Sequence, residues 1–113
     1  MKKIAGKLIG GGIRIMDVTN IIAVHSNTHE QIIFLRNGDT VRIRQTLISL
    51  KEELEQGAPG QFISIGKSVV VNMMDIDAIY PDHIVLSNGN EFPLTKGSYR
   101  RIQKQVLAYL QTL

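Results

Sequence analysis

The residues best suited to binding chemistry in this sequence are basic, and they gather near the carboxyl end. Between Phe92 and Leu113 there are four cationic side chains and no acidic one. They are Lys96, Arg100, Arg101 and Lys104. The spacing of four between Lys96, Arg100 and Lys104 places them along one edge of a helix and of the loop before it. A solvated surface explains any single cation, but the cluster as a whole favours contact with nucleic-acid phosphates.

Further cations lie in two other segments. Arg36, Arg42 and Arg44 belong to a predicted hairpin, in which Arg42 and Arg44 point to the same face. Lys67 stands in a predicted loop between a glycine and a serine. Small residues and a cation in one loop suit close approach to phosphates and base edges. The net charge of +3 and the pI of about 9.4 agree with an anionic partner.

The residues give no support to enzymatic chemistry. Serines and histidines are present, but no serine stands in a Gly-x-Ser-x-Gly nucleophile elbow. The run Gly66-Lys67-Ser68 matches the end of a phosphate-binding loop. Gly60, however, lies one residue too early to supply the first glycine, and a strand rather than a helix is predicted next. We therefore predict a protein that is not an enzyme and uses no cofactor.

Metal binding is equally unsupported. His25 and His29 are four residues apart, which brings two side chains together on a helix but not on a strand that runs into a loop. Asp75 and Asp77 alternate beside a predicted strand, and a calcium loop would need more oxygen ligands and a glycine turn. We expect both aspartates to face solvent and predict no metal site.

Length and composition point to one small folded domain. A chain of 113 residues allows a single core, and 43% hydrophobic with 20% charged residues suits a globular fold. There is no cysteine, so disulfides and thiolate metal sites are excluded. Lys7 and three glycines interrupt any apolar signal segment after Lys2-Lys3. We expect a cytoplasmic protein with a flexible lead-in over residues 1–12 and one domain over 13–113.

Short segments rich in β-branched residues recur along the chain and predict strands. They span 13–16, 21–24, 32–35, 41–43, 62–65, 69–71, 76–80, 84–86 and 91–94. Asn37-Gly38 predicts a hairpin with a type I′ turn, in which both residues adopt positive φ. Two helices are predicted, over 47–56, with Thr46 as its cap and Gly57 as its end, and over 98–111. The expected fold class is mainly β with few helices.

The two predicted Asn-Gly hairpins resemble one another. Residues 33–39 read IFLRNGD and residues 84–90 read IVLSNGN. Each hairpin leads through a threonine, Thr46 or Thr95, into a helix. Because nothing else in the two halves of the sequence matches, convergence of two similar hairpins is preferred to a true repeat.

One longer segment carries a family resemblance. Residues 62–72, FISIGKSVVVN, followed by isoleucines at 76 and 79, resemble the central signature of the LytTR family of bacterial DNA-binding domains. That pattern is roughly Phe-x-Arg-x-His-Lys/Arg-Ser-aromatic-x-Val-Asn. The strand pair, hairpin and threonine-leucine helix before it also fit, as does the exit over residues 86–95. The resemblance covers about residues 13–110. The chain departs from this pattern at three positions. Ser64 stands where the family often has arginine, Gly66 where it often has histidine, and Val69 where it often has an aromatic residue.

The resemblance implies a fold of short antiparallel strands whose loops, rather than a recognition helix, enter successive major grooves. His29, Lys67 and Lys96 match contact positions of the family, and the two arginines of the last helix are expected to hold phosphates without reading sequence. The DNA-binding residues predicted in this way are Asn27, His29, Lys67, Ser68, Lys96, Arg100 and Arg101.

The expected partner is double-stranded DNA, bound for transcription regulation. Family members commonly bind paired direct repeats, so we expect two copies, as a homodimer on DNA. Many members carry an amino-terminal receiver domain, and this chain is either a stand-alone regulator or a piece of a larger one. The alternative is a non-catalytic, β-rich adaptor that binds a protein or RNA. Most of the six aromatic residues sit at core-like positions, which disfavours stacking on single-stranded RNA.

Overall fold

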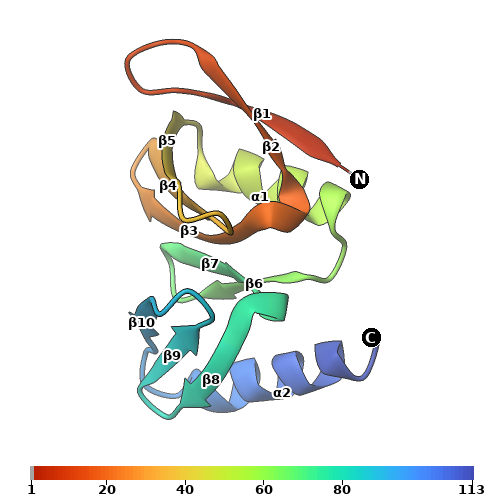
Figure 1. The fold of residues 1–113 in the computed structure, drawn as a ribbon. Coiled ribbons are helices and arrows are strands. Elements are labelled where there is room, and N and C mark those ends of the chain that lie inside the picture. The colour runs from red at the N-terminus through yellow and green to blue at the C-terminus, as the bar shows by residue number, and fades with distance from the viewer. Residues whose placement is uncertain (1) are drawn as a thin grey trace.

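A five-stranded antiparallel sheet runs through the middle of the molecule and is covered on both faces (Figure 1). The computed structural model describes residues 2–113. The strand order in this sheet is β5-β4-β3-β7-β6. Its strands are β3 (Ile21–Asn27), β4 (Glu30–Leu35), β5 (Thr40–Arg44), β6 (Phe62–Ile65) and β7 (Val69–Asn72). The pairing of β3 with β7 joins the two halves of the chain in one sheet.

Two smaller antiparallel sheets complete the β structure. A hairpin of β1 (Lys3–Lys7) and β2 (Ile13–Asp17) forms one of them. A meander in the order β10-β9-β8 forms the other. Its strands are β8 (Ile76–Tyr80), β9 (His83–Leu86) and β10 (Glu91–Pro93). Two short 3₁₀ turns, η1 (Val18–Asn20) and η2 (Met73–Asp75), lead into β3 and β8.

The two helices cover opposite faces of the central sheet. Leu50 and Leu54 of α1 (Leu47–Gly57) pack in a core with the β1–β2 hairpin. Ile102 and Val106 of α2 (Tyr99–Leu110) pack in a second core with the three-stranded sheet. The predicted mainly β fold with two helices is confirmed. Within residues 2–113, no helix is both long and apolar enough to cross a membrane.

The valine run in β7 shows why both faces of the central sheet need cover. Val70 is buried in the core beneath α1, whereas Val69 and Val71 are buried in the core beneath α2. Successive side chains of a strand point to opposite faces, so an uninterrupted apolar strand has to be packed on both sides. Val69 thus fills a strand position, although the family often places an aromatic residue there.

The chain repeats one order of elements. The first half, residues 3–57, runs β1, β2, η1, β3, β4, β5, α1, and the second half, residues 62–110, runs β6, β7, η2, β8, β9, β10, α2. Each 3₁₀ turn is capped by an Asx side chain, and each following strand has a bulge at the same place, after Ile21 and after Ile76. The correspondence extends far beyond the Asn-Gly hairpins, so the structure favours a repeat over the convergence expected from sequence.

The amino-terminal segment differs from its prediction. Residues 1–12 were expected to form a flexible lead-in, but Lys3–Lys7 form strand β1, and Ile4 is buried in the first core. Gly6 allows this packing, because a Cβ at that position would lie 2.6 Å from Cγ2 of Ile43. The β1–β2 tip also covers the edge of β5, where Leu8 pairs with Ile43 and the Ile9 amide donates to the Arg42 carbonyl at 3.2 Å.

The prediction for the first hairpin turn also needs correction. In the first Asn-Gly hairpin only Gly38 has a positive φ, of 96°, so the turn is not type I′. The Leu35 amide donates to the Asp39 carbonyl, and the Asn37 side chain accepts from the Asp39 amide at 2.9 Å, which gives a longer loop. Gly57 is the last residue of α1, so the helix ends where predicted, although Gly57 does not adopt a left-handed conformation. A Cβ there would lie 2.8 Å from Cγ2 of Val18, so the residue permits close packing.

Candidate nucleic-acid interface

Two of the predicted contact loops lie side by side at one end of the central sheet. The β3–β4 turn carries Asn27 and His29, and the β6–β7 turn carries Lys67 and Ser68. Because β3 and β7 are antiparallel neighbours, the end of one strand lies beside the start of the other. The Ser26 amide donates to the Ser68 carbonyl at 2.6 Å and thereby links the two turns directly.

The third predicted contact loop connects β10 to α2 and lies against the β6–β7 turn. A Cβ at Gly66 would be in van der Waals contact with Cγ2 of Thr95, at 3.9 Å. Lys96 is the next residue in this loop. At the start of α2, the Arg101 Nη2 donates to the Ser64 carbonyl of β6 at 3.2 Å, so the helix is tied to the same edge of the sheet. The three loops therefore form one continuous surface, with one loop from the first half and two from the second.

The predicted contact side chains on this surface are accessible. Asn27, His29, Lys67 and Lys96 are exposed, and Ser68 is half-buried. Within residues 2–113, neither Lys67 nor Lys96 forms an ion pair with a carboxylate. Both ammonium groups are free to meet an anionic ligand.

Each of the first two turns contains one residue with left-handed backbone. In the β6–β7 turn this residue is Gly66, with φ of 65°, and glycine adopts that conformation without steric cost. In the β3–β4 turn it is Thr28, with φ of 56°. Threonine is β-branched and rarely adopts positive φ, so this turn is strained. Strain next to His29 marks the turn as a place where geometry is imposed by the surrounding structure.

A profile of the LytTr DNA-binding domain matches residues 11–107. The chain belongs to the LytTR family. Its function in general terms is therefore DNA binding and transcription regulation. A solved LytTr DNA-binding domain, of a putative methyl-accepting/DNA response regulator from Bacillus cereus, has the same fold. It superposes with a TM-score of 0.72 at 19% identity, over 95% of this chain and 97% of that one. Among curated proteins, none matches the chain.

The three departures from the LytTR signature occupy different places in the fold. Gly66 lies in a contact loop, whereas Val69 is buried in the core beneath α2. Ser64 lies on the other face of the sheet, where it lines a small cleft with Lys51 and Glu55 of α1. The Ser64 side chain is therefore directed away from the contact loops, and of the three departures only Gly66 changes the loop surface itself.

The two arginines of α2 do not share one environment. Arg101 reaches the Ser64 carbonyl and also lies 3.4 Å from Oε1 of Gln105, so it sits beside the contact loops. Arg100 lines a groove on the outer side of the helix with Lys104 and Leu107. The structure thus brings Arg101, but not Arg100, directly against the β6 edge that leads into the Lys67 loop.

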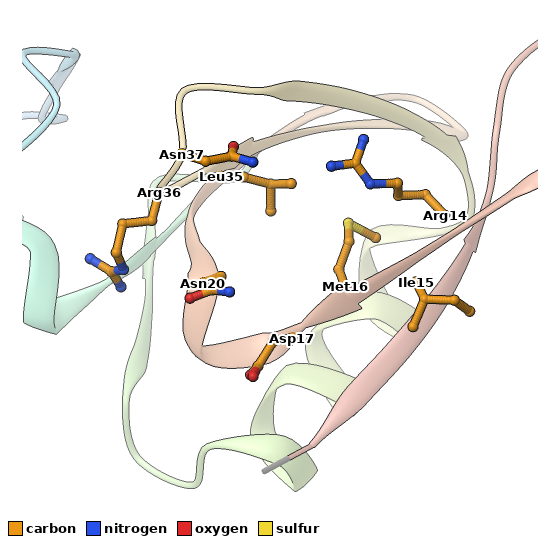
Figure 2. Close-up of a pocket in the computed structure, with 8 residues that line it drawn as sticks. All are labelled: Arg14, Ile15, Met16, Asp17, Asn20, Leu35, Arg36 and Asn37. Atoms are coloured by element: carbon orange, nitrogen blue, oxygen red, sulfur yellow. The ribbon is translucent and has the colours of Figure 1, made fainter.

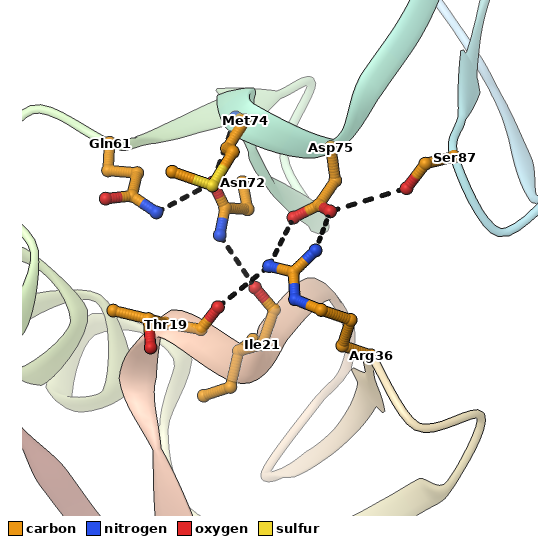
Figure 3. Close-up of polar contacts among 8 residues, drawn as sticks. All are labelled: Thr19, Ile21, Arg36, Gln61, Asn72, Met74, Asp75 and Ser87. Atoms are coloured by element: carbon orange, nitrogen blue, oxygen red, sulfur yellow. Dashed lines mark hydrogen bonds and ion pairs between the residues drawn. The ribbon is translucent and has the colours of Figure 1, made fainter. Parts of the chain in front are cut away.

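Arg36, which belonged to the predicted basic hairpin, serves an internal role in this LytTR domain. Its guanidinium pairs with the buried Asp75 carboxylate and donates to the Thr19 carbonyl at 2.8 Å (Figure 3). Asp75 also accepts from the Ser87 hydroxyl at 3.3 Å. The expectation that Asp75 faces solvent is therefore wrong, because a cation 39 residues earlier compensates its charge. Asp77 is exposed, as expected.

The other two arginines of the first hairpin differ from one another. Arg42 pairs with Glu30 across the β4–β5 ladder. Arg44 is exposed and, in the described part of the chain, has no carboxylate partner. It lines an open cleft of about 720 Å³ together with His29 and Ile9. Nothing in the sequence distinguishes the three arginines of this hairpin as cations. Of the three, only Arg44 adds a cation beside the His29 loop that is unpaired within the described residues.

A cavity of about 380 Å³ lies away from the loops, between β2 and the first Asn-Gly turn (Figure 2). Arg14 and Arg36 line it, and both are already paired, Arg14 with Asp39 at 3.0 Å and Arg36 with Asp75. The Arg14 guanidinium and the Asn37 amide hold the pKa of the Asp39 carboxyl below its ordinary value. Because its cations are satisfied internally, this cavity offers little to an anionic ligand.

The histidines other than His29 lie in separate surroundings. His25 is exposed on β3 and packs edge-on against the ring of Phe92, with centroids 6.3 Å apart. His83 stacks on Tyr80 and contacts Asp82 at 2.7 Å, a hydrogen bond that lowers the pKa of the Asp82 carboxyl. Among residues 2–113, no group of three or more His, Asp or Glu side chains could hold a metal ion.

Proposed function

We propose that this LytTR domain binds double-stranded DNA sequence-specifically, by placing its three contact loops in successive major grooves, and so regulates transcription. The observation that carries the proposal is the continuous surface made by the β3–β4, β6–β7 and β10–α2 loops, on which Lys67 and Lys96 have no carboxylate partner. Loops of this size that present exposed cations and small polar side chains can reach base edges in a major groove.

The side chains on this surface suggest a division of roles. Lys67 and Lys96 can donate to the guanine acceptors O6 and N7 or to phosphates, and His29 can donate or accept at a base edge. Asn27 and Ser68 flank these side chains and can form further hydrogen bonds in the groove. Arg101, beside β6, can hold a phosphate and so orient the domain on the duplex.

The first test is selection of binding sites from a pool of randomised duplexes, followed by affinity measurements against salt. We expect an enriched motif and an affinity that falls steeply as salt rises, because bound phosphates release counterions. Two spaced copies of the motif would support the expected pair of protomers on direct repeats. An absence of enrichment, with weak and purely salt-sensitive binding, would contradict base reading and favour the adaptor that binds a protein or RNA.

The contact residues are tested on the selected duplex. Lys67→Ala and Lys96→Ala should each weaken binding by roughly 1–3 kcal/mol if they contact bases. Lys51→Ala is the matched control, because it removes the same charge from the exposed face of α1, away from the loops. Equal affinities and equal site preferences for all three variants would contradict the contact assignment.

A further inference from the structure

The β3–β4 turn that carries His29 is held from behind by a partly buried polar network. The His29 carbonyl accepts from the Gln45 amide at 2.9 Å, so the turn is fixed to the linker between β5 and α1. Gln31 is fully buried, and its Nε2 donates to the Gln45 carbonyl, also at 2.9 Å. The backbone of Gln45 is thus held at both of its polar groups, at the amide by the loop and at the carbonyl by Gln31.

The network continues into α1, away from the contact loops. The Gln45 side chain donates to Oε2 of Glu53 at 2.7 Å and to the Ser49 hydroxyl at 3.1 Å. Glu53 is half-buried in the middle turn of the helix. The strained turn is therefore connected to a rigid element through one linker residue.

Two features of this network suit a role in geometry rather than in stability. The Gln31 Oε1 is buried and has no hydrogen-bond partner among the described residues, and an unsatisfied buried acceptor costs free energy. Thr28 keeps φ of 56° although it is β-branched. Unfavourable groups of this kind persist where the surrounding structure imposes a functional conformation.

We propose that Gln31, Gln45 and Glu53 are positioning residues for DNA recognition, which set the height and direction of His29 at the DNA surface without touching DNA themselves. This inference rests on the proposed function, because it takes His29 as a DNA contact. It assigns base specificity to residues beneath the loop as well as to those on it.

The main variant is Gln31→Met, which keeps the side-chain length and removes both the donor and the unsatisfied acceptor. Folding stability should change little, since the loss of the hydrogen bond is offset by removal of the orphan oxygen. Affinity for the selected duplex should fall by about three- to tenfold, the equivalent of one hydrogen bond. Affinity for a random duplex, and the salt dependence, should stay unchanged.

A second pair of variants separates positioning from packing. Glu53→Gln keeps an oxygen acceptor for the side-chain amide of Gln45 and should retain wild-type affinity and base preference. Glu53→Met removes the acceptor and should lose specificity as Gln31→Met does. Ile84→Val, in the core beneath α2, serves as a control that loosens packing remote from the β3–β4 turn. If Ile84→Val relaxes base preference as much as Gln31→Met, the positioning role is overturned.

The deciding measurement combines Gln31→Met with His29→Ala. If Gln31 acts through His29, its effect on the selected duplex should disappear in the His29→Ala background. Additive losses would overturn the inference while leaving His29 as a contact. If His29→Ala alone changes nothing, the contact assignment in the proposed function fails, and the role in recognition fails with it.

Hydrogen exchange of the backbone amide of Gln45, measured in the free protein, then shows whether Gln31→Met loosens the turn. Unchanged exchange would overturn the link between Gln31 and the turn.

Discussion

The two halves of the molecule have the same order of elements but are used differently. In the second half, the β6–β7 hairpin pairs with β3 and becomes part of the central sheet. In the first half, the equivalent β1–β2 hairpin remains a separate two-stranded sheet and lies over the edge of β5. The repeat is therefore asymmetric, and a single large sheet contains strands of both halves.

This asymmetry explains where the contact surface is. The pairing of β3 with β7 brings a loop of the first half against two loops of the second half. The same backbone contact occurs in both halves, where the amides of Arg36 and Ser87 donate to the carbonyls of Asn20 and Asp75, each at 2.8 Å. Of these two donors, however, Arg36 also pairs through its side chain with Asp75 of the other half, whereas the Ser87 side chain bonds within its own half. Equivalent positions thus serve local structure in one half and the junction between halves in the other.

The largest effect should come from breaking the charged link between the halves. Arg36→Met leaves the Asp75 carboxylate, whose side chain is 2% exposed, without its cation, and should lower the free energy of unfolding by about 3 kcal/mol. Urea denaturation measures this loss. Arg14→Met is the control within one half, since Arg14 and Asp39 are both exposed and should contribute little. Comparable losses in the two variants would contradict the special role of the junction.

A smaller but clear effect is expected at the caps of the two 3₁₀ turns. Asn72 is buried, donates to the Ile21 carbonyl of β3 at 3.0 Å, and accepts from Gln61 and from the Met74 amide. Asn72→Ala should cost about 2 kcal/mol, because it leaves the buried Ile21 carbonyl and two partly buried donors without their partner. Its counterpart Asp17 caps only its own turn, and Asp17→Ala should cost less in the same denaturation experiment. The reverse order would show that the junction does not depend on Asn72.

The left-handed residues of the two contact turns should respond in opposite directions. Gly66→Ala places a side chain at φ of 65° and should destabilise the fold by about 1 kcal/mol. Thr28→Gly removes strain at φ of 56°, but glycine loses more backbone entropy on folding. The net effect should stabilise the fold by about 0.5 kcal/mol. Thermal unfolding compares the two. A loss of stability in Thr28→Gly would show that the turn is not strained.

The smallest effect concerns acid stability, because only the first half has an ionisable cap. The Thr19 hydroxyl and then the Thr19 amide donate to Asp17 and lower the pKa of its carboxyl. A carboxyl with a lowered pKa in the folded state stabilises the protein above its unfolded pKa, and that contribution is lost as pH falls through the folded value. Asp17→Asn should therefore flatten the decline of stability below about pH 4. If the stability of Asp17→Asn declines with acid as steeply as that of the wild-type protein, this account is contradicted.

Much of the fold was predictable because its signals are local. The β-branched segments became strands within a few residues of their predicted limits, and Thr46 caps α1 through the Ser49 amide at 3.2 Å. The strand β1 was missed because its reason is not local. Its sequence, KIAGK, is short and has only one β-branched residue, and it becomes a strand through packing such as the contact of Gly6 with Ile43. The repeat was missed for a similar reason, since the two halves share backbone arrangement more than side chains.

The site was predictable only in part. The resemblance to LytTR proteins supplied the predicted contact residues, but their convergence depends on the pairing of β3 with β7, which no spacing along the chain reveals. The environment of Asp75 was predicted wrongly because its partner, Arg36, is 39 residues away. Gln31 gave a weak signal that was available, because it is the one polar residue among the inward positions of β4, the other two being Ile33 and Leu35.

The β1–β2 tip on β5 has a consequence for how the protein behaves in solution. Leu8 and Ile9 occupy backbone groups of β5 that would otherwise be open, and Arg101 occupies one carbonyl on β6 at the opposite edge. A bare sheet edge is a template for strand addition by another molecule. We therefore expect the glycine-rich hairpin to protect this edge from strand addition, and a truncation that begins at Ile13 to expose the β5 edge and to promote aggregation.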